Sequence, residues 1–307
     1  MNKKRIEGPI IVTGGFGFIG SNLIKTLNEK EYTDIIVVED LGNVSNGACQ
    51  NISDLEFYTV CDIHDFDFCD CGGASIFHLG ADSSTSINFL RAINWNYYWD
   101  KKFTDGEYGR AKKIVFASSA SVYGNSTTNA IKPQNPYAVA KRLSEQYVLL
   151  GNNNVVARLF NVYGPREFHK GKMMSFQSRL LKSFMSSVNW SVMYYKNNAL
   201  RDFVYVTDVT EALVNLMEME TAPKICDLGT GSPRSFGEVL RLSELQAEVY
   251  GGKLNIDEQP WRNAPINTSQ YQMYSKAFPP DWAKFRPLEE GIKALWQYYD
   301  PVLKTEL

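Results

Sequence analysis

The stretch TGGFGFIG at residues 13–20 follows directly on the β-branched apolar run IIV at residues 10–12. Such a run is typical of a buried parallel strand, and the sequence after the glycines predicts a helix. Gly14, Gly17 and Gly20 have the spacing G-x-x-G-x-x-G, which allows a tight turn, close approach of the backbone to a pyrophosphate, and close packing of helix on strand. The phosphates would lie at the helix N-terminus. The stretch therefore predicts an α/β fold that opens with a dinucleotide-binding unit.

A second buried strand, predicted at residues 35–38, ends in two acids. Glu39 and Asp40 lie roughly 20 residues beyond the glycine loop, where a carboxylate binds the ribose hydroxyls of a dinucleotide. Between Lys30 and Arg91 the chain has eleven acidic residues and no lysine or arginine. A 2′-phosphate would meet carboxylates there and no local cation. The charge pattern therefore predicts NAD as the cofactor, with NADP as the less favoured alternative.

Two further predicted strands end in residues that could contact the cofactor. Asp62 and Ile63 are placed to touch adenine, with a surface turn as the alternative interpretation. Gly80 and Ala81 form a small tip that would let the backbone approach the cofactor. We interpret His78, just before this tip, as a packed strand residue rather than a catalyst.

The middle third of the chain carries a candidate acid–base group. A buried strand leads to the segment SSASVYG at residues 118–124, and Asn135 and Pro136 can cap and begin a helix. The spacing of four places Tyr137 and Lys141 on one face of that helix. A tyrosine is a weak base at its ordinary pKa of about 10, and a neighbouring ammonium favours the phenolate. A serine hydroxyl at the end of the adjacent strand could hydrogen-bond the substrate oxygen.

These motifs resemble those of the extended short-chain dehydrogenase/reductase family, the nucleotide-sugar epimerases and dehydratases. The resemblance covers essentially the whole chain and rests on TGGFGFIG, the serine-tipped strand, YAVAK at 137–141, NVYGPR at 161–166, RDFVYV at 201–206 and DLGTG at 227–231. It implies an α/β fold, a Rossmann-like doubly wound parallel sheet with a smaller interleaved α/β substrate-binding domain. The family's serine stands four positions before the tyrosine of an S-x-x-x-Y-G segment, which selects Ser119 over Ser118.

Two local features narrow the subfamily. Ala120 and Ser121 stand where dehydratases of the family carry an Asp-Glu pair, so loss of water is disfavoured. The extension EFHKG at residues 167–171 resembles the E-x-H-K-G segment of the ADP-glycero-manno-heptose 6-epimerases. By this resemblance Lys170 is a second acid/base across the substrate from the tyrosine. Phe168 departs from the pattern, which has glycine at that position.

The motifs and the resemblance together imply three sets of site residues and no metal site. The catalytic residues are Ser119, Tyr137, Lys141 and Lys170. The cofactor-binding residues are Gly14, Gly17, Phe18, Ile19, Gly20, Glu39, Asp40, Asp62, Ile63, Leu79, Gly80, Ala81, Ser83, Tyr137, Lys141 and Val162. The substrate-binding residues are Ser119, Asn161, Lys172, Arg179, Arg201 and Arg262, of which Lys172, Arg179 and Arg262 could equally lie in solvent. The asparagine that the family places near the nicotinamide is Asn94 or Asn96.

Transient oxidation of a sugar carbon favours two proton-transfer groups, because the ketone must turn its other face before it is reduced. We therefore expect Tyr137 and Lys170 to exchange roles in an NAD-dependent nucleotide-sugar epimerase, an isomerase of cell-surface carbohydrate or lipopolysaccharide biosynthesis that acts on an ADP-heptose. One alternative is a UDP- or GDP-hexose 4-epimerase or reductase with a single base, in which Lys170 binds a phosphate or lies in solvent. The other is a non-catalytic NAD-sensing regulator.

The composition limits partners and location. The 307 residues carry 32 basic and 34 acidic side chains, so no basic field attracts nucleic acid or an anionic membrane. Three scattered histidines disfavour a metal site, and five cysteines without a C-x-x-C pair fit reduced thiols in the cytoplasm. Residues 8–24 are uncharged but too rich in glycine for a membrane span, and we expect no cleavable signal before them. The aromatic cluster at residues 95–99 fits a core or the face of a homo-oligomer.

Two interleaved domains are predicted. Residues 1–160 form the NAD-binding domain, to which residues 202–222 and about 264–280 return. Residues 161–201, 223–263 and 281–307 form the substrate-binding domain.

Overall fold

The computed structural model describes residues 2–66, 72–82, 88–97, 111–126, 128, 130–186, 190–194, 199–260 and 275–303. Its largest element is a seven-stranded sheet with the strand order β11-β6-β5-β4-β1-β2-β3. Neighbouring strands in this sheet are parallel. The strands are β1 (Ile10–Thr13), β2 (Ile35–Glu39), β3 (Thr59–Asp62), β4 (Ser75–His78), β5 (Lys113–Ser119), β6 (Val155–Leu159) and β11 (Ile225–Leu228). This sheet confirms the predicted doubly wound fold.

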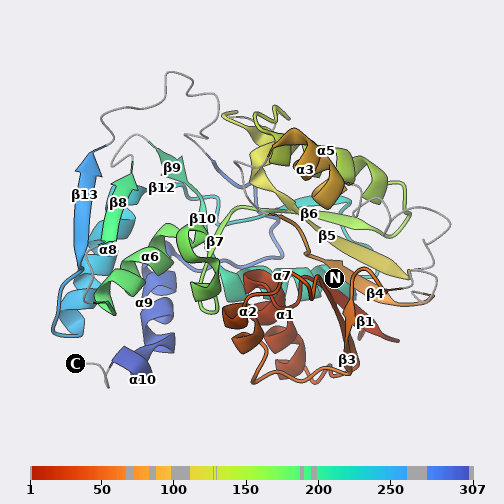
Figure 1. Cartoon of the computed structure of the whole chain (residues 1–307). Coiled ribbons are helices and arrows are strands. Elements are labelled where there is room, and N and C mark those ends of the chain that lie inside the picture. Colours follow the sequence, from red (N-terminus) through yellow and green to blue (C-terminus); the bar gives the residue numbers. More distant parts are fainter. Residues whose placement is uncertain are drawn as a thin grey trace.

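Helices cover the two faces of the sheet, so its strands are near-continuous apolar runs. Figure 1 shows α1 (Phe18–Glu29) and α7 (Val206–Glu218) below the sheet, and α3 (Phe89–Ala92) and α5 (Pro136–Val148) above it. A π-helical turn, Ile93–Tyr97, continues α3. The central strand β1 lies between β2 and β4, where the order of strands reverses. In open α/β sheets the carboxyl ends of the strands at such a point form the ligand-binding crevice.

A smaller α/β part lies beside the sheet, on the left of Figure 1. It has three two-stranded pairs, β10-β7, β12-β9 and β13-β8, and its own apolar cluster around the fully buried Trp296. Its elements are β7 (Asn161–Tyr163), α6 (Phe176–Phe184), β8 (Trp190–Tyr194), β9 (Leu200–Arg201), β10 (Phe203–Tyr205), β12 (Arg234–Ser235), α8 (Phe236–Val249), β13 (Ile256–Pro260), α9 (Leu288–Tyr298) and α10 (Asp300–Leu303). This arrangement confirms the predicted smaller part. In the described segments no helix combines the length and the apolar character needed to cross a bilayer.

The strand β11 corrects one predicted boundary. Residues 223–263 were predicted to lie in the substrate-binding part, but Ile225–Leu228 pairs with β6 in the main sheet. The sequence of this four-residue strand does not reveal which sheet it joins, because its partner strand lies far away in the chain. Of the segment predicted to return at about 264–280, residues 264–274 lie outside the described residues. The other domain limits stay predictions.

Candidate active site

The glycine-rich loop forms a cradle at the carboxyl end of β1. Gly14 has a φ of +68°, and a Cβ at this position would lie 2.8 Å from the Cα of Gly80. A Cβ on Gly20 would collide with the carbonyl of Gly14. Gly17 is the N-cap of α1, and within the part of the chain that the structure describes no side chain caps this helix. Open amides at a helix N-terminus, with no side chain in the cradle, fit the pyrophosphate of NAD.

Thr13 joins two strand ends beside this loop. Its Oγ1 accepts hydrogen bonds from the N–H groups of Leu79 (3.1 Å) and Gly80 (3.0 Å), and it lies 2.7 Å from Nδ1 of His78. His78 is 2% exposed, and 5.6 Å separates the centroid of its ring from that of Phe116. His78 is thus packed within the sheet, and its contact with Thr13 holds the tip of β4 against the glycine loop.

The two acids after β2 have different environments. Glu39 accepts the N–H groups of Phe16 (3.0 Å) and Asp40 (3.2 Å), and burial raises the pKa of its carboxyl. Asp40 Oδ2 accepts the side-chain amide of Asn43 at 2.7 Å. Asp40 Oδ1 is buried with no hydrogen-bond donor among the described residues, since His64 Nε2 lies 3.8 Å away. A ribose hydroxyl would supply the missing donor, so Asp40 fits the role predicted for it.

One pocket of about 480 Å³ collects most of the predicted cofactor and catalytic residues. The predicted residues that line it are Gly14, Gly17, Phe18, Ile19, Gly20, Glu39, Asp40, Leu79, Gly80, Ala81, Ser119, Tyr137, Lys141, Val162 and Lys170. His169 and the segment that leads into α2 (Asn46–Gln50) also line it and were missed. Ser45 in this segment caps α2 by accepting the N–H of Ala48 at 3.2 Å. A serine before a short helix is the signal that could have found the segment.

The helix α5 carries Tyr137 and Lys141 one turn apart at this pocket. It begins where the sequence predicts, because Asn135 Oδ1 accepts the N–H of Ala138 at 2.9 Å. Lys141 is 2% exposed, and its Nζ lies 4.5 Å from the centroid of the Phe116 ring. The backbone thus places the phenol and the ammonium on one face, as the spacing predicts.

Ser119 is the last residue of β5 and lines the same pocket. Its Oγ accepts the N–H of Ser121 at 3.1 Å, so the hydroxyl hydrogen of Ser119 is not used in that contact. The neighbouring Ser118 is 3% exposed and donates its hydroxyl to Glu145 at 2.6 Å. The geometry therefore agrees with the choice of Ser119 over Ser118 as the serine that meets substrate.

A buried polar network lies behind these residues and was not predicted. Arg158 binds both oxygens of Glu145, with two hydrogen bonds of 2.8 Å, and it donates to the hydroxyl of Tyr123 at 2.8 Å. Tyr123 in turn donates to Asp227 at 2.7 Å. Burial raises the pKa of both Tyr123 and Asp227. The network joins α5 to β6 and β11, so it fixes the helix that carries Tyr137 relative to the sheet.

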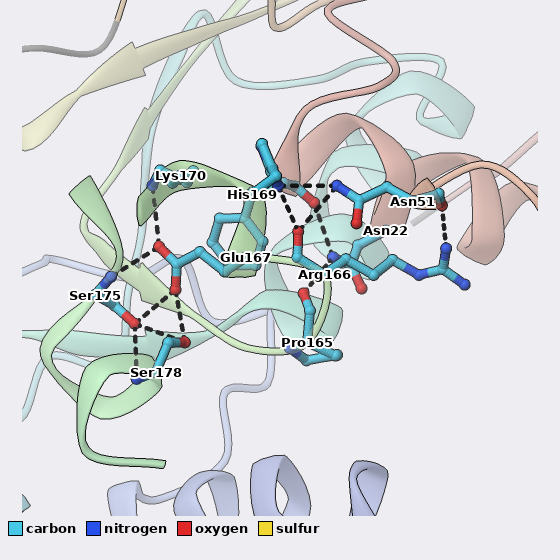
Figure 2. A network of polar contacts seen from close by, with 10 residues as sticks. Asn22, Asn51, Pro165, Arg166, Glu167, His169, Lys170, Ser175 and Ser178 are labelled. Carbon is cyan, nitrogen blue, oxygen red and sulfur yellow. Dashed lines mark hydrogen bonds and ion pairs between the residues drawn. The ribbon is translucent and has the colours of Figure 1, made fainter. Parts of the chain in front are cut away.

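The turn after β7 brings Lys170 to the same pocket, beside the first turn of α1. Lys170 belongs to the 3₁₀ helix Phe168–Met173 and pairs with Glu167 at 2.9 Å. Figure 2 shows this contact within a wider set of polar contacts around residues 165–178. Lys170 Nζ also lies 5.3 Å from the centroid of the Phe18 ring, at the first turn of α1. The structure therefore brings Lys170 and Tyr137 to one pocket although they lie in different parts of the fold.

Some predicted cofactor contacts are not brought to this pocket. Asp62 Oδ1 accepts the N–H of His64 at 2.8 Å, and Ile63 packs against an apolar cluster of the sheet. Asn96 is fully buried and holds the backbone of Asp82, whereas Asn94 is exposed. Ser83 lies outside the described residues, as does the predicted substrate residue Arg262. The adenine contacts of Asp62 and Ile63 stay predictions.

Apart from Ser119 in the main sheet and Arg262 outside the described residues, the predicted substrate residues lie in the smaller part. Asn161 donates its side-chain amide to Ser275 Oγ at 3.0 Å, and Lys172 is exposed. Burial lowers the pKa of Arg179 and lowers that of Arg201 to about 10. No carboxylate among the described residues pairs with Arg201, whose guanidinium donates to the carbonyl of Leu200 at 3.1 Å. Arg201 is therefore the predicted substrate residue whose surroundings most favour an anion.

Comparison with known proteins adds a family and several similar structures. The family described as "NAD dependent epimerase/dehydratase family" matches residues 10–229. The ADP-L-glycero-D-manno-heptose-6-epimerase of Helicobacter pylori is 25% identical, with 96% of this chain and 97% of that chain covered and a TM-score of 0.76. The UDP-N-acetylglucosamine 4-epimerase of Methanobrevibacter ruminantium, in complex with UDP-N-acetylmuramic acid, is 22% identical, with coverages of 98% and 100% and a TM-score of 0.78. The UDP-glucuronic acid 4-epimerase of Bacillus cereus, in complex with UDP-glucuronic acid and NAD, is 22% identical, with coverages of 96% and 100% and a TM-score of 0.72. The last two likenesses concern the fold alone.

Proposed function

The chain belongs to the NAD-dependent epimerase/dehydratase family, and we propose that within it this isomerase is a nucleotide-sugar epimerase that inverts C6 of an ADP-glycero-manno-heptose. The observation that carries the proposal is the presence of Lys170 on the pocket that also holds Ser119, Tyr137 and Lys141. Lys170 belongs to the segment EFHKG, and the heptose 6-epimerase of Helicobacter pylori is similar over nearly the whole chain.

Tyr137 is the proposed acid/base of one half-reaction. Lys141 is one helical turn away and almost fully buried, and its ammonium favours the phenolate of the tyrosine. Ser119 would donate its hydroxyl hydrogen to the substrate oxygen that loses or gains the proton. When bound, NAD supplies the reversible two-electron oxidation of the sugar carbon. The residues of the chain therefore have to orient the sugar and move one proton in each direction.

Lys170 is the proposed acid/base of the other half-reaction. The ketone formed by oxidation presents its opposite face before it is reduced, so the proton has to come from a different side of the pocket. Lys170 lies on the turn after β7, beside Phe18 of α1, whereas Tyr137 lies on α5. Two proton-transfer groups on separate elements suit inversion better than one group does.

Arg201 is the proposed contact of the substrate diphosphate. Its side chain is half-buried and unpaired by any carboxylate in the described ranges, and this burial lowers its pKa to about 10. An arginine matches phosphate oxygens with two parallel hydrogen bonds. A nucleotide diphosphate would thus supply the negative charge that the surroundings of Arg201 lack. We also propose that the enzyme works in the cytoplasm, where its five cysteines without a C-x-x-C pair would stay reduced.

A panel of nucleotide sugars tests the proposal. The purified protein with NAD is incubated with ADP-, UDP- and GDP-sugars in H₂O and in D₂O, and products are read by NMR. Inversion of an ADP-heptose at C6 without solvent deuterium at that carbon supports the proposal. Inversion of a UDP- or GDP-hexose at C4 instead identifies the single-base alternative. NAD binding without turnover of any sugar would support the alternative of a non-catalytic NAD-sensing regulator. Deuterium at the inverted carbon would contradict transient oxidation.

A further inference from the structure

The carboxylate of Glu167 is 1% exposed and accepts four hydrogen bonds, as Figure 2 shows. Lys170 Nζ and the N–H of Ser175 donate to Oε1, each at 2.9 Å. The hydroxyls of Ser175 and Ser178 donate to Oε2, at 2.6 and 2.8 Å. Four donors on two oxygens hold the carboxylate in one orientation. Among these donors Lys170 is the one that also lines the pocket.

The turn that carries Glu167 is anchored on its other side as well. Arg166 has a φ of 67°, a left-handed conformation that a residue with a side chain keeps only where its surroundings hold it. Its carbonyl accepts the side-chain amide of Asn51 at 3.0 Å and lies 3.1 Å from Nδ1 of His169. Its guanidinium contacts the carbonyl of Asn51 and, at 2.6 Å, the carboxylate of Asp54. Since Asn51 ends α2, the turn is held against the segment that lines the cofactor pocket.

The charges around Lys170 make Glu167 its counter-ion. Arg179 on α6 adds a second positive charge near Glu167. Burial lowers the pKa of Arg179, and the negative charge of Glu167 partly offsets this effect. Burial, and then the charge of Lys170, lowers the pKa of His169, so His169 adds no fixed positive charge. The ring of Phe18 on α1 faces Lys170 Nζ and also favours the ammonium. The segment α2 carries no charged residue. The other titratable groups of the pocket are Glu39, Asp40, Tyr137 and Lys141.

We propose that Glu167 is a positioning residue that holds Lys170 at the pocket as an ammonium, ready to act as an acid. The inference rests on the proposed function, in which Lys170 is the second acid/base. The substrate hydroxyl then gives its proton to Tyr137, and the oxygen of the turned ketone takes its proton from Lys170. After turnover, solvent returns a proton to Lys170, whose side chain is 26% exposed, and takes up the proton that Tyr137 gained, so both groups regain their starting state.

A labelling experiment tests the contact without a sugar. Wild type, Glu167→Gln and Glu167→Asp are treated with an amine-acetylating ester over a range of pH, and mass spectrometry follows acetylation of Lys170. Exposed Lys172 is the internal reference. Loss of the carboxylate favours the neutral, reactive amine, so we expect labelling of Lys170 near pH 8 to rise roughly tenfold in Glu167→Gln. Glu167→Asp should stay closer to wild type. Equal labelling in all three proteins would overturn the inference.

Kinetics test what the contact does. In Glu167→Gln we expect kcat to fall roughly 10- to 100-fold with little change in KM, and the limb of the kcat–pH profile that reports proton loss from Lys170 to move to lower pH. The double variant Glu167→Gln/Lys170→Ala should be no slower than Lys170→Ala alone, because the two residues act as a unit. Lys182→Ala, which removes another lysine near Phe168, is the matched control. Should Glu167→Gln not fold, Glu167→Asp still tests the contact, because its shorter side chain lengthens the 2.9 Å contact with Lys170 and the same changes should appear at smaller size.

Two outcomes separate the inference from the proposed function. If wild type inverts a nucleotide sugar but the kcat losses of the two single variants multiply and the pH profile of Glu167→Gln is unchanged, Glu167 is only structural and the inference fails. If wild type inverts no nucleotide sugar, the proposed function fails and the acid role of Lys170 fails with it. The labelling result then still decides whether Glu167 holds the charge of Lys170.

Discussion

Arg158 and Glu145 form a two-pronged ion pair inside the protein, with both hydrogen bonds at 2.8 Å and the carboxylate fully buried. The pair lies behind the pocket, between β6 and the helix that carries Tyr137. It therefore links that helix to the sheet and fixes the orientation of the helix.

Glu145→Gln should lower the free energy of unfolding by about 3–5 kcal/mol, because it leaves the buried charge of Arg158 unpaired. Chemical denaturation followed by circular dichroism measures the loss. Arg142→Gln is the matched control, since Arg142 also pairs with Glu145 (2.8 Å) but is one-third exposed, and we expect a loss below about 1 kcal/mol. Similar losses of unfolding free energy in both variants would show that the buried pair contributes no more to stability than the exposed one.

Tyr137→Phe should lower kcat about 10²- to 10⁴-fold, because the phenylalanine has no proton to transfer. NAD binding, read by calorimetry, should weaken far less than kcat falls, since the cradle and Asp40 are untouched. Tyr147→Phe, on the same helix, is the control and should keep wild-type kcat. Substantial turnover by Tyr137→Phe would assign the proton transfer to another group.

Asp40→Ala should weaken NAD binding by about 1–3 kcal/mol, because the variant loses the acceptor expected to meet a ribose hydroxyl. Isothermal titration calorimetry measures Kd for NAD and for NADP, with Asp65→Ala as an exposed control. Wild type should bind NAD more tightly than NADP. An unchanged Kd in Asp40→Ala would place the ribose elsewhere in the pocket.

Arg201→Met should raise the unfolding free energy of the ligand-free protein by about 2 kcal/mol, since it removes a half-buried cation that no described carboxylate pairs. The folded-state pKa of Arg201, about 10, lies below its ordinary value because burial disfavours the charged form. The destabilising effect of the charge is therefore fully present below about pH 10 and decreases above it. The stability gain of Arg201→Met should follow the same trend, and its affinity for the nucleotide sugar should fall.

Arg234→Met is the control for this pair of measurements. Arg234 is paired with Glu238 and Glu289 near the surface, so its loss should not stabilise the protein. A wild-type protein more stable than Arg201→Met at pH 7 would contradict an unpaired buried charge at position 201.

The sequence by itself determined the features that depend on short spacings. A strand, a G-x-x-G-x-x-G loop and a helix follow one another in 20 residues, and Tyr137 and Lys141 share a face because a helix repeats every few residues. Asn135 caps that helix by contacts within one turn. Such local geometry follows from backbone rules, so the fold class, the NAD loop and the Tyr137–Lys141 pair could be predicted.

Only the tertiary structure decided the relationships between distant segments. The place of β11 in the main sheet, the pairing of Glu145 with Arg158 and the contact of Asn51 with Arg166 depend on which surfaces the folded chain brings together. The same holds for Glu167: its charge lies three residues from Lys170 in the sequence, but its two serine partners come from the start of α6. A buried carboxylate needs hydrogen-bond donors around it, and tertiary packing, rather than the spacing of residues in the sequence, determines which donors these are.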